Sequence, residues 1–291
     1  DVLFCPGNIS PIIKTSKIKS QWVATLGPFH KEAYIGFKFG EKLILSLNKF
    51  FTYWSSVTSN ATIHESQYSM NLFVNKFRLK EKNHKLIICG KNNIFYPDTK
   101  TKIENTTLKS MKKTDILCVS HFYPYKNLEL LVHAFQEFSV CSDNDTTSLF
   151  ICGRPAFQGY FEKVKELVNK NRLKAKVHFT GSINHDDLRV AYSKCKLFVF
   201  PSLCESSGYT LIEAMSCGAP VLGSNSTAIP YTCGFAAEYF EAHDQNDLAK
   251  KMIKLLSNDT LLNEMKEKSK ARAKEVLDYE QASKKLDSIF M

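Results

Sequence analysis

The chain has 291 residues, which is enough for two domains or for one large α/β domain, and 44% of them are hydrophobic. Charged residues make up 23% and are mixed with apolar ones, which excludes a disordered protein. The net charge of +10 is uneven: residues 1–112 hold 17 Lys and Arg against seven Asp and Glu, whereas residues 113–291 hold 22 of each.

The basic first part indicates either an anionic partner or only better solubility, and charge alone does not separate the two. The candidate partners are a phospholipid surface, a lipid-diphosphate acceptor and nucleic acid. Nucleic acid ranks last, because such binding uses clustered arginine with aromatic platforms and Arg78 is the only arginine in residues 1–112.

Signals for export and membrane insertion are missing from the sequence. No apolar run reaches the ~18 residues that a membrane-spanning helix needs. Asp1 stands where a natural start would have Met, and a strand-like run follows at once, so we expect a cytoplasmic chain whose first domain is truncated at its start. The nine cysteines form no C-x-x-C pair, which favours reduced, buried thiols over metal ligands or disulfides.

Residues 1–112 are predicted to form the later part of an α/β domain and a linker. The expected strands are 2–5, 22–26, 61–64 and 85–89, the expected helices are 39–54 and 67–77, and the Asn- and Lys-rich linker is 98–113. In the helix 39–54, lysines occupy one stripe and large apolar residues another. This pattern suits a basic helix lying on an anionic membrane surface, and it equally suits an ordinary helix facing a core.

Residues 113–275 alternate between short β-rich runs and helical patterns. The expected strands are 116–120, 148–152, 177–180, 197–201 and 220–224, and the expected helices are 127–139, 158–170, 185–194, 209–217, 244–257 and 260–275. Strands separated by helices of this length predict a doubly wound parallel sheet with helices on both faces. An amphipathic helix at about 280–290 leads us to expect that 276–291 packs back across both domains.

A small-residue loop follows the strand that ends at Pro201, and a helix begins near Gly208. Helix N-termini carry unpaired N–H groups and partial positive charge, so this turn is suited to a phosphate or a sugar. Glu213 lies among apolar residues of that helix. A ribose diol would satisfy its carboxylate, and so would an exposed position or a backbone cap.

Lys126 follows the strand 116–120 and opens a helix, where a cation is disfavoured. A bound diphosphate nearby would make the position favourable. A lysine whose charge is in water would also be tolerated there.

The block 117–240 resembles the retaining, family 4 type glycosyltransferases of the GT-B fold, also described as glycosyl transferases group 1. Their donor domain carries two glutamates eight positions apart, with glycine third after the first, and Glu205, Gly208 and Glu213 match this pattern. The segments 117–127, 150–153, 177–181 and 214–221 resemble neighbouring parts of that domain, and 27–29 and 85–97 resemble acceptor-domain segments more weakly.

The resemblance implies two Rossmann-like domains facing a cleft: an acceptor-binding domain with the linker in 1–112, a donor-binding domain in 113–275 and a C-terminal helix in 276–291. It implies that Lys126 binds the donor diphosphate, that Glu205 contacts the donor sugar and that Glu213 holds the ribose. Further donor-binding positions would be His121 in place of the usual arginine, Gly181 and Ser182 beside the base, and the backbone of Ser207, Gly208, Tyr209, Thr210 and Leu211.

Two positions depart from the family pattern. Tyr231 replaces a glutamate that usually follows the proline at 230, and Gly27 stands near the place of a histidine, for which His30 is a weak substitute.

The function that this implies is transfer of a hexosyl group, with retention, from a UDP- or GDP-linked sugar to a glycan or lipid-diphosphate acceptor. No metal or cofactor is expected. Contact with the inner face of the cell membrane is a further hypothesis. Two alternatives stay open, a non-catalytic sugar-nucleotide-binding protein and another GT-B enzyme such as a nucleotide-sugar epimerase.

Overall fold

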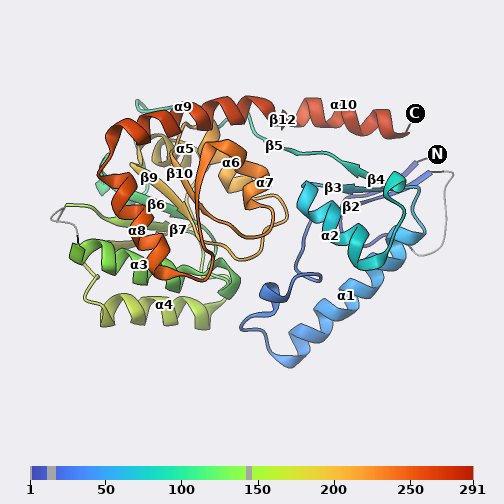
Figure 1. Cartoon of the computed structure of the whole chain (residues 1–291), viewed down its shortest axis with the longest axis horizontal. Coiled ribbons are helices and arrows are strands. Elements are labelled where there is room, and N and C mark those ends of the chain that lie inside the picture. Colours follow the sequence, from blue (N-terminus) through green and yellow to red (C-terminus); the bar gives the residue numbers. More distant parts are fainter. Residues whose placement is uncertain (1, 12–17, 142–145, 291) are drawn as a thin grey trace.

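The computed structural model describes residues 2–11, 18–141 and 146–290. It confirms an α/β architecture with two larger all-parallel sheets, which Figure 1 shows at opposite ends of the long axis, and a small two-stranded parallel sheet. Each larger sheet has its own hydrophobic clusters, so we call them the first half (residues 2–112) and the second half (residues 113–276) of the chain.

The sheet of the second half has six strands in the order β11-β10-β9-β6-β7-β8. Its strands are short runs of Val, Ile, Leu, Phe and Cys that are mostly buried, as expected for a parallel sheet covered on both faces. Their bounds are β6 (Ile116–Val119), β7 (Leu149–Cys152), β8 (Val177–Gly181), β9 (Leu197–Phe200), β10 (Val221–Ser224) and β11 (Ala237–Phe240).

Helices cover both faces of this sheet, as predicted. One core lies under α3, α4 and α8, and a second lies under α5, α6 and α7, while α9 contributes to both. The bounds are α3 (Leu128–Cys141), α4 (Gln158–Lys170), α5 (His185–Lys194), α6 (Tyr209–Ser216), α7 (Ile229–Cys233), α8 (Gln245–Leu256) and α9 (Asp259–Glu275). The sequence did not predict α7 or β11, because neither is long enough to show a clear period.

The sheet of the first half has four strands in the order β1-β2-β3-β4. Its elements are β1 (Val2–Cys5), β2 (Ile18–Val23), α1 (Phe39–Val57), β3 (Ala61–His64), α2 (Gln67–Phe77) and β4 (His84–Leu86). The prediction of a strand at 22–26 was wrong by several residues, because β2 begins with buried polar side chains. Lys19 is fully buried there and donates hydrogen bonds to Pro11 O and to Thr58 Oγ1, so its ammonium is satisfied.

The predicted strand 85–89 proved to be two strands. β4 belongs to the first sheet, whereas β5 (Cys89–Lys91) pairs in parallel with β12 (Leu277–Asp278), which lies between α9 and α10 (Tyr279–Phe290). Figure 1 shows α10 running over the first sheet, and its Ala282, Leu286 and Phe290 pack in a cluster with Ile63 and Ile87. The chain therefore crosses between the halves twice.

The linker is packed against the second half. Ile103, Leu108 and Met111 are buried in the core that also contains α5 and α6. Short 3-10 helices lie at η1 (Lys31–Tyr34), η2 (Glu81–Asn83), η3 (Leu108–Ser110), η4 (Pro124–Lys126) and η5 (Gly234–Ala236). Among the described residues, no helix combines the length and the apolar character needed to cross a membrane.

Candidate donor-binding site

A buried ion pair marks the carboxyl end of the second sheet. Lys126 ends the short turn η4 after β6, and Glu205 lies in the loop between β9 and α6. Lys126 Nζ lies 2.5 Å from Glu205 Oε1, and the two side chains are 16% and 13% exposed. Because the carboxyl ends of adjacent parallel strands meet at one edge, residues 79 positions apart come together where open α/β sheets bind ligands.

Lys126 is held as an ammonium. Burial alone would lower the pKa of Lys126, but the Glu205 carboxylate outweighs it and raises that pKa above its ordinary value. The ammonium also lies 5.3 Å from the ring centre of Tyr125 and 5.6 Å from that of Phe200. An ammonium has three N–H donors, so Lys126 can contact an incoming phosphate while it still contacts Glu205.

A cavity of about 420 Å³, which we call the donor cavity, opens beside Lys126. Four of the predicted site residues line it, namely His121, Lys126, Ser182 and Thr210. The other lining residues are Val119, Ser120, Tyr123, Tyr125, Cys152, Gly153, Ile183, His185 and Leu188. The cavity thus combines an apolar wall, which suits a flat base, with the cation at one end.

His121 contributes hydrogen bonding rather than charge. Its Nδ1 accepts a hydrogen bond from the backbone N–H of Arg154 at 3.3 Å. Burial, together with the charges of Arg154 and Lys126, lowers the pKa of His121, so the imidazole is neutral at pH 7. Arg154 follows β7, and its exposed side chain places a second cation near His121, outside the lining of the cavity. The sequence analysis did not select Arg154, because a single exposed arginine after a strand carries no local signal.

The start of α6 is shaped by Gly208, which has φ +80°. This backbone angle favours glycine, and a Cβ there would lie 2.8 Å from Leu211 Cδ1, so the leucine side chain would have to shift. Ser207 is buried, and its Oγ has no hydrogen-bond partner among the described residues. Thr210 reaches the donor cavity, which leaves the first turn of α6 directed at the ligand space.

Three further predicted donor positions, Gly181, Tyr209 and Leu211, are not part of the lining of the donor cavity. The amide of Leu211 donates to Gly208 O at 2.9 Å and its side chain is fully buried, so Leu211 is not available to a ligand. The hydroxyl of Tyr209 points toward the first half of the chain. Gly181 ends β8 with φ +70° and open space at its Cβ position, next to the Ser182 that lines the cavity.

Glu213 is set back from the donor cavity, whose lining does not include it. Its Oε2 accepts a hydrogen bond at 3.2 Å from the hydroxyl of Tyr192, a fully buried residue of α5. Burial raises the pKa of Glu213 to about 7, although the Tyr192 hydrogen bond opposes that shift. This carboxylate is poorly satisfied as an anion, a condition that two hydroxyls of a bound ribose would relieve.

Glu205 does not line the donor cavity; it faces a second cavity, of about 270 Å³, between the two halves. Thr25, Leu26 and Gly27 line it from the first half, whereas Tyr125 and Ser206 line it from the second. His30 lies elsewhere, in a larger cavity of about 1010 Å³ that it shares with Tyr68, Thr227 and the loop 241–246. His30 therefore does not occupy the position beside Gly27.

Glu65 joins the two halves beside these cavities. It follows β3, is 4% exposed and accepts hydrogen bonds from Trp22 Nε1 at 2.9 Å, from Tyr209 Oη at 2.8 Å and from Ser206 Oγ at 3.3 Å. Burial raises the pKa of Glu65, against the opposing effect of these hydrogen bonds. The sequence analysis missed Glu65, although a glutamate directly after a buried strand was a usable signal.

Comparison with known structures defines the class of fold. Sucrose-phosphate synthase from Thermosynechococcus elongatus superposes with a TM-score of 0.77 at 20% identity, covering 94% of this chain and 67% of that chain. HepE from Anabaena, solved with UDP and glucose, superposes with a TM-score of 0.75 at 16% identity, covering 94% of this chain and 71% of that chain. The fold is GT-B, as the sequence predicted.

Sequence comparison defines the family. The family described as "Glycosyl transferases group 1" matches residues 99–272, so this chain belongs to that glycosyltransferase family. The serotype-specific mannosyltransferase WbdA of Escherichia coli is 34% identical over 152 residues, which are 52% of this chain and 18% of WbdA. O-antigen chain mannosyltransferase B of Escherichia coli is 27% identical over 145 residues, which are 50% of this chain and 37% of that protein. The matches thus span well under half the length of these relatives.

Proposed function

We propose that this chain transfers a hexosyl group from a UDP- or GDP-linked sugar to a glycan or lipid-diphosphate acceptor, with retention of the anomeric configuration. A mannosyl group is the first candidate, because both curated relatives described above are named as mannosyltransferases. The observation that carries the proposal is the buried Lys126–Glu205 pair, whose lysine lines a nucleotide-sized cavity together with Thr210 of the first turn of α6.

The proposed mechanism depends on stabilising the negative charge of the leaving diphosphate. When the bond between the anomeric carbon and the diphosphate oxygen breaks, negative charge accumulates on the departing diphosphate. Lys126 and the N–H groups at the start of α6 stabilise that charge, and Arg154 adds long-range attraction. Neutral His121 donates a hydrogen bond from its free ring nitrogen. No step of this scheme uses a metal ion or a cofactor.

Glu205 is suited to orient the sugar rather than to form a covalent bond with it. Its backbone N–H donates to Thr227 Oγ1 at 2.9 Å, and one carboxylate oxygen contacts Lys126, which fixes the side chain in the cavity that faces the first half, next to the lysine that lines the donor cavity. The acceptor would approach through the cavity of about 270 Å³ that Gly27 and Glu205 line between the two halves. Retention of configuration rests on the family resemblance.

We propose that the first half of the chain, which would bind the acceptor, contacts a membrane surface. The helix α1 exposes Phe39, Leu43, Ile44, Leu47, Phe50 and Trp54, together with Lys38 and Lys42. Exposed apolar residues flanked by lysines suit an interface between lipid headgroups and acyl chains with anionic lipids. This surface belongs to the basic half of the chain, so its charge complements such a bilayer.

A direct assay tests the proposal. The full-length protein is incubated with UDP- and GDP-linked hexoses, and the products are separated. Free nucleoside diphosphate together with a glycosylated acceptor supports transfer. An epimerised donor would identify an epimerase, and a thermal shift without any turnover would identify a binding protein. Either of the last two results would refute the proposed transfer.

A further inference from the structure

Another cavity, which we call the lysine cavity, lies between the linker and α5. It has a volume of about 700 Å³ and is lined by Thr99, Lys100, Thr101, Lys102, Ile103, Glu104, Lys109, Lys113, Val190 and Lys194. None of these residues lines the donor cavity, so the two spaces are separate. Its volume falls within the range of small-molecule sites.

The lining of the lysine cavity is strongly basic. Five of its ten residues are lysines, and Glu104 is its one carboxylate. In the described part of the chain, none of these five lysines forms an ion pair. Ammonium groups gathered around one hollow repel each other, and a bound anion would relieve that repulsion.

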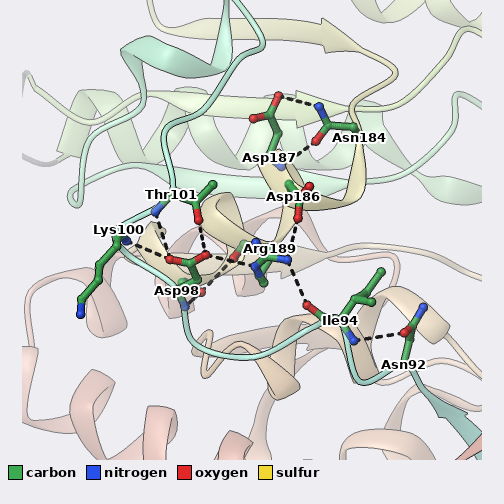
Figure 2. Close-up of polar contacts among 10 residues, drawn as sticks. Asn92, Ile94, Asp98, Lys100, Thr101, Asn184, Asp186, Asp187 and Arg189 are labelled. Atoms are coloured by element: carbon green, nitrogen blue, oxygen red, sulfur yellow. Dashed lines mark hydrogen bonds and ion pairs between the residues drawn. The ribbon is translucent and has the colours of Figure 1, made fainter.

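The other carboxylates in this region are already engaged, as Figure 2 shows. Arg189 contacts Asp98 at 3.2 Å and Asp186 at 2.7 Å. Asp187 accepts the backbone N–H of Glu104 at 2.7 Å. These contacts leave Glu104 as the one carboxylate that faces the five lysines, so most of the positive charge of the cavity is uncompensated.

The same contacts hold the walls of the cavity in place. Asp98 accepts hydrogen bonds from the N–H of Lys100 at 2.9 Å and from the hydroxyl of Thr101 at 2.7 Å. The pKa of Asp98 is consequently held well below its usual range. The buried side chains of Ile103 and Val190 form an apolar floor. Lys100 and Lys102 therefore extend from a backbone segment that hydrogen bonds to Asp98 and Asp187 hold in place.

We propose that the lysine cavity binds an anion that carries several phosphate groups. Lysine ammonium groups are compact point charges on flexible stems, so they adapt to phosphate oxygens without a fixed orientation. Two sources can present this chemistry, a free oligophosphate and the phosphorylated headgroup of a lipid. Because the lysine cavity is separate from the donor cavity, binding there is independent of nucleotide-sugar binding.

Calorimetric titration with inorganic tripolyphosphate at physiological ionic strength tests the proposal. The wild-type protein should bind at one site, and the double variant K109S/K113S should bind at least about tenfold more weakly. A matched control is K80S/K82S, which removes two exposed lysines from the first half of the chain and should bind like the wild type. Equal weakening by both double variants, or binding that disappears at physiological salt, would refute the site.

Two further experiments test whether charge is responsible for the binding and which source supplies the anion. The charge-preserving variant K109R/K113R should retain most of the affinity, which separates lost charge from lost folding. Phosphatidylcholine vesicles with and without a phosphatidylinositol bisphosphate identify the source. If the vesicles that contain this lipid compete with tripolyphosphate, the ligand is a lipid headgroup; if they do not compete, it is the free anion. Loss of binding in K109R/K113R with unchanged melting temperature would contradict the proposal.

Discussion

The two halves of the chain bury different kinds of side chain. In the second half, β6, β7 and β9 are almost entirely apolar and covered by helices on both faces. In the first half, Lys19, Gln21 and His64 are fully buried, while the helix α1 turns its apolar residues outward, with Phe39 83% exposed. The second half is therefore a self-contained core that can hold a rigid site, whereas the first half presents apolar surface that suits a partner.

The largest expected effect concerns the rigid site. Lys126→Ala removes the ammonium from the proposed leaving group and leaves Glu205 unpaired, so transfer should fall by about a thousandfold. Steady-state kinetics of the full-length protein measure it. Lys163→Ala is the matched control, because Lys163 also contacts a glutamate, Glu129 at 2.9 Å, but on the exposed surface. Equal activity of both variants would remove Lys126 from the mechanism.

The next effect tests the contact between the halves. Glu65→Ala removes the acceptor that holds Tyr209, Ser206 and Trp22, so kcat should fall about tenfold while affinity for the nucleoside diphosphate changes little. Glu65→Gln keeps one acceptor oxygen and should recover part of the rate. A fall in nucleotide affinity with unchanged kcat would show that Glu65 acts on donor binding instead of on the arrangement of the halves.

A smaller effect is expected for Glu213→Gln, whose influence on stability can be measured apart from its influence on ligand binding. Its pKa is raised by burial to about 7, so its stabilising contribution is complete below the ordinary carboxyl pKa and is lost as the pH rises through 7. Glu213→Gln should therefore be more stable than the wild type at pH 8 by about 1–2 kcal/mol, as measured by urea unfolding.

The same variant should lose discrimination between ribose and 2′-deoxyribose. The wild type is expected to bind a nucleoside diphosphate more tightly than its 2′-deoxy form, by about tenfold. If Glu213→Gln discriminates as well as the wild type, the carboxylate does not hold the ribose.

The smallest effect on folding is expected at α1. Phe50 and Trp54 are exposed, so replacing both with Ser should leave the melting temperature nearly unchanged, while binding to vesicles with anionic lipid should weaken strongly. Co-sedimentation measures the binding. Val140→Ser is the control, since Val140 is 79% exposed but lies on α3 of the other half. Unchanged vesicle binding of the α1 variant would contradict a membrane-facing role.

The sequence predicted the second half well because its signals are local. Runs of Val, Ile, Leu and Phe at β7 and β9 can be buried only in a covered parallel sheet, and the spacing of Glu205, Gly208 and Glu213 is a short-range pattern. The sequence did not predict the ion pair between Lys126 and Glu205, because 79 positions separate the two residues.

The sequence failed where burial is polar or contacts are distant. The polar start of β2 does not look like a strand, and only the hydrogen bonds of Lys19 make its burial acceptable. The contact of Glu65 with Tyr209 spans 144 positions and depends on how the two halves pack. Arg154 lies beside His121 only because β7 pairs with β6.

The central claim is that the donor cavity seats a nucleoside diphosphate with its phosphates at Lys126. Calorimetric titration of UDP and GDP, alongside uridine and guanosine, into wild-type protein and Lys126→Met tests it most directly. We predict that the variant loses at least about tenfold in affinity for the better diphosphate but binds the matching nucleoside as the wild type does. Equal diphosphate affinity in both proteins would contradict the account.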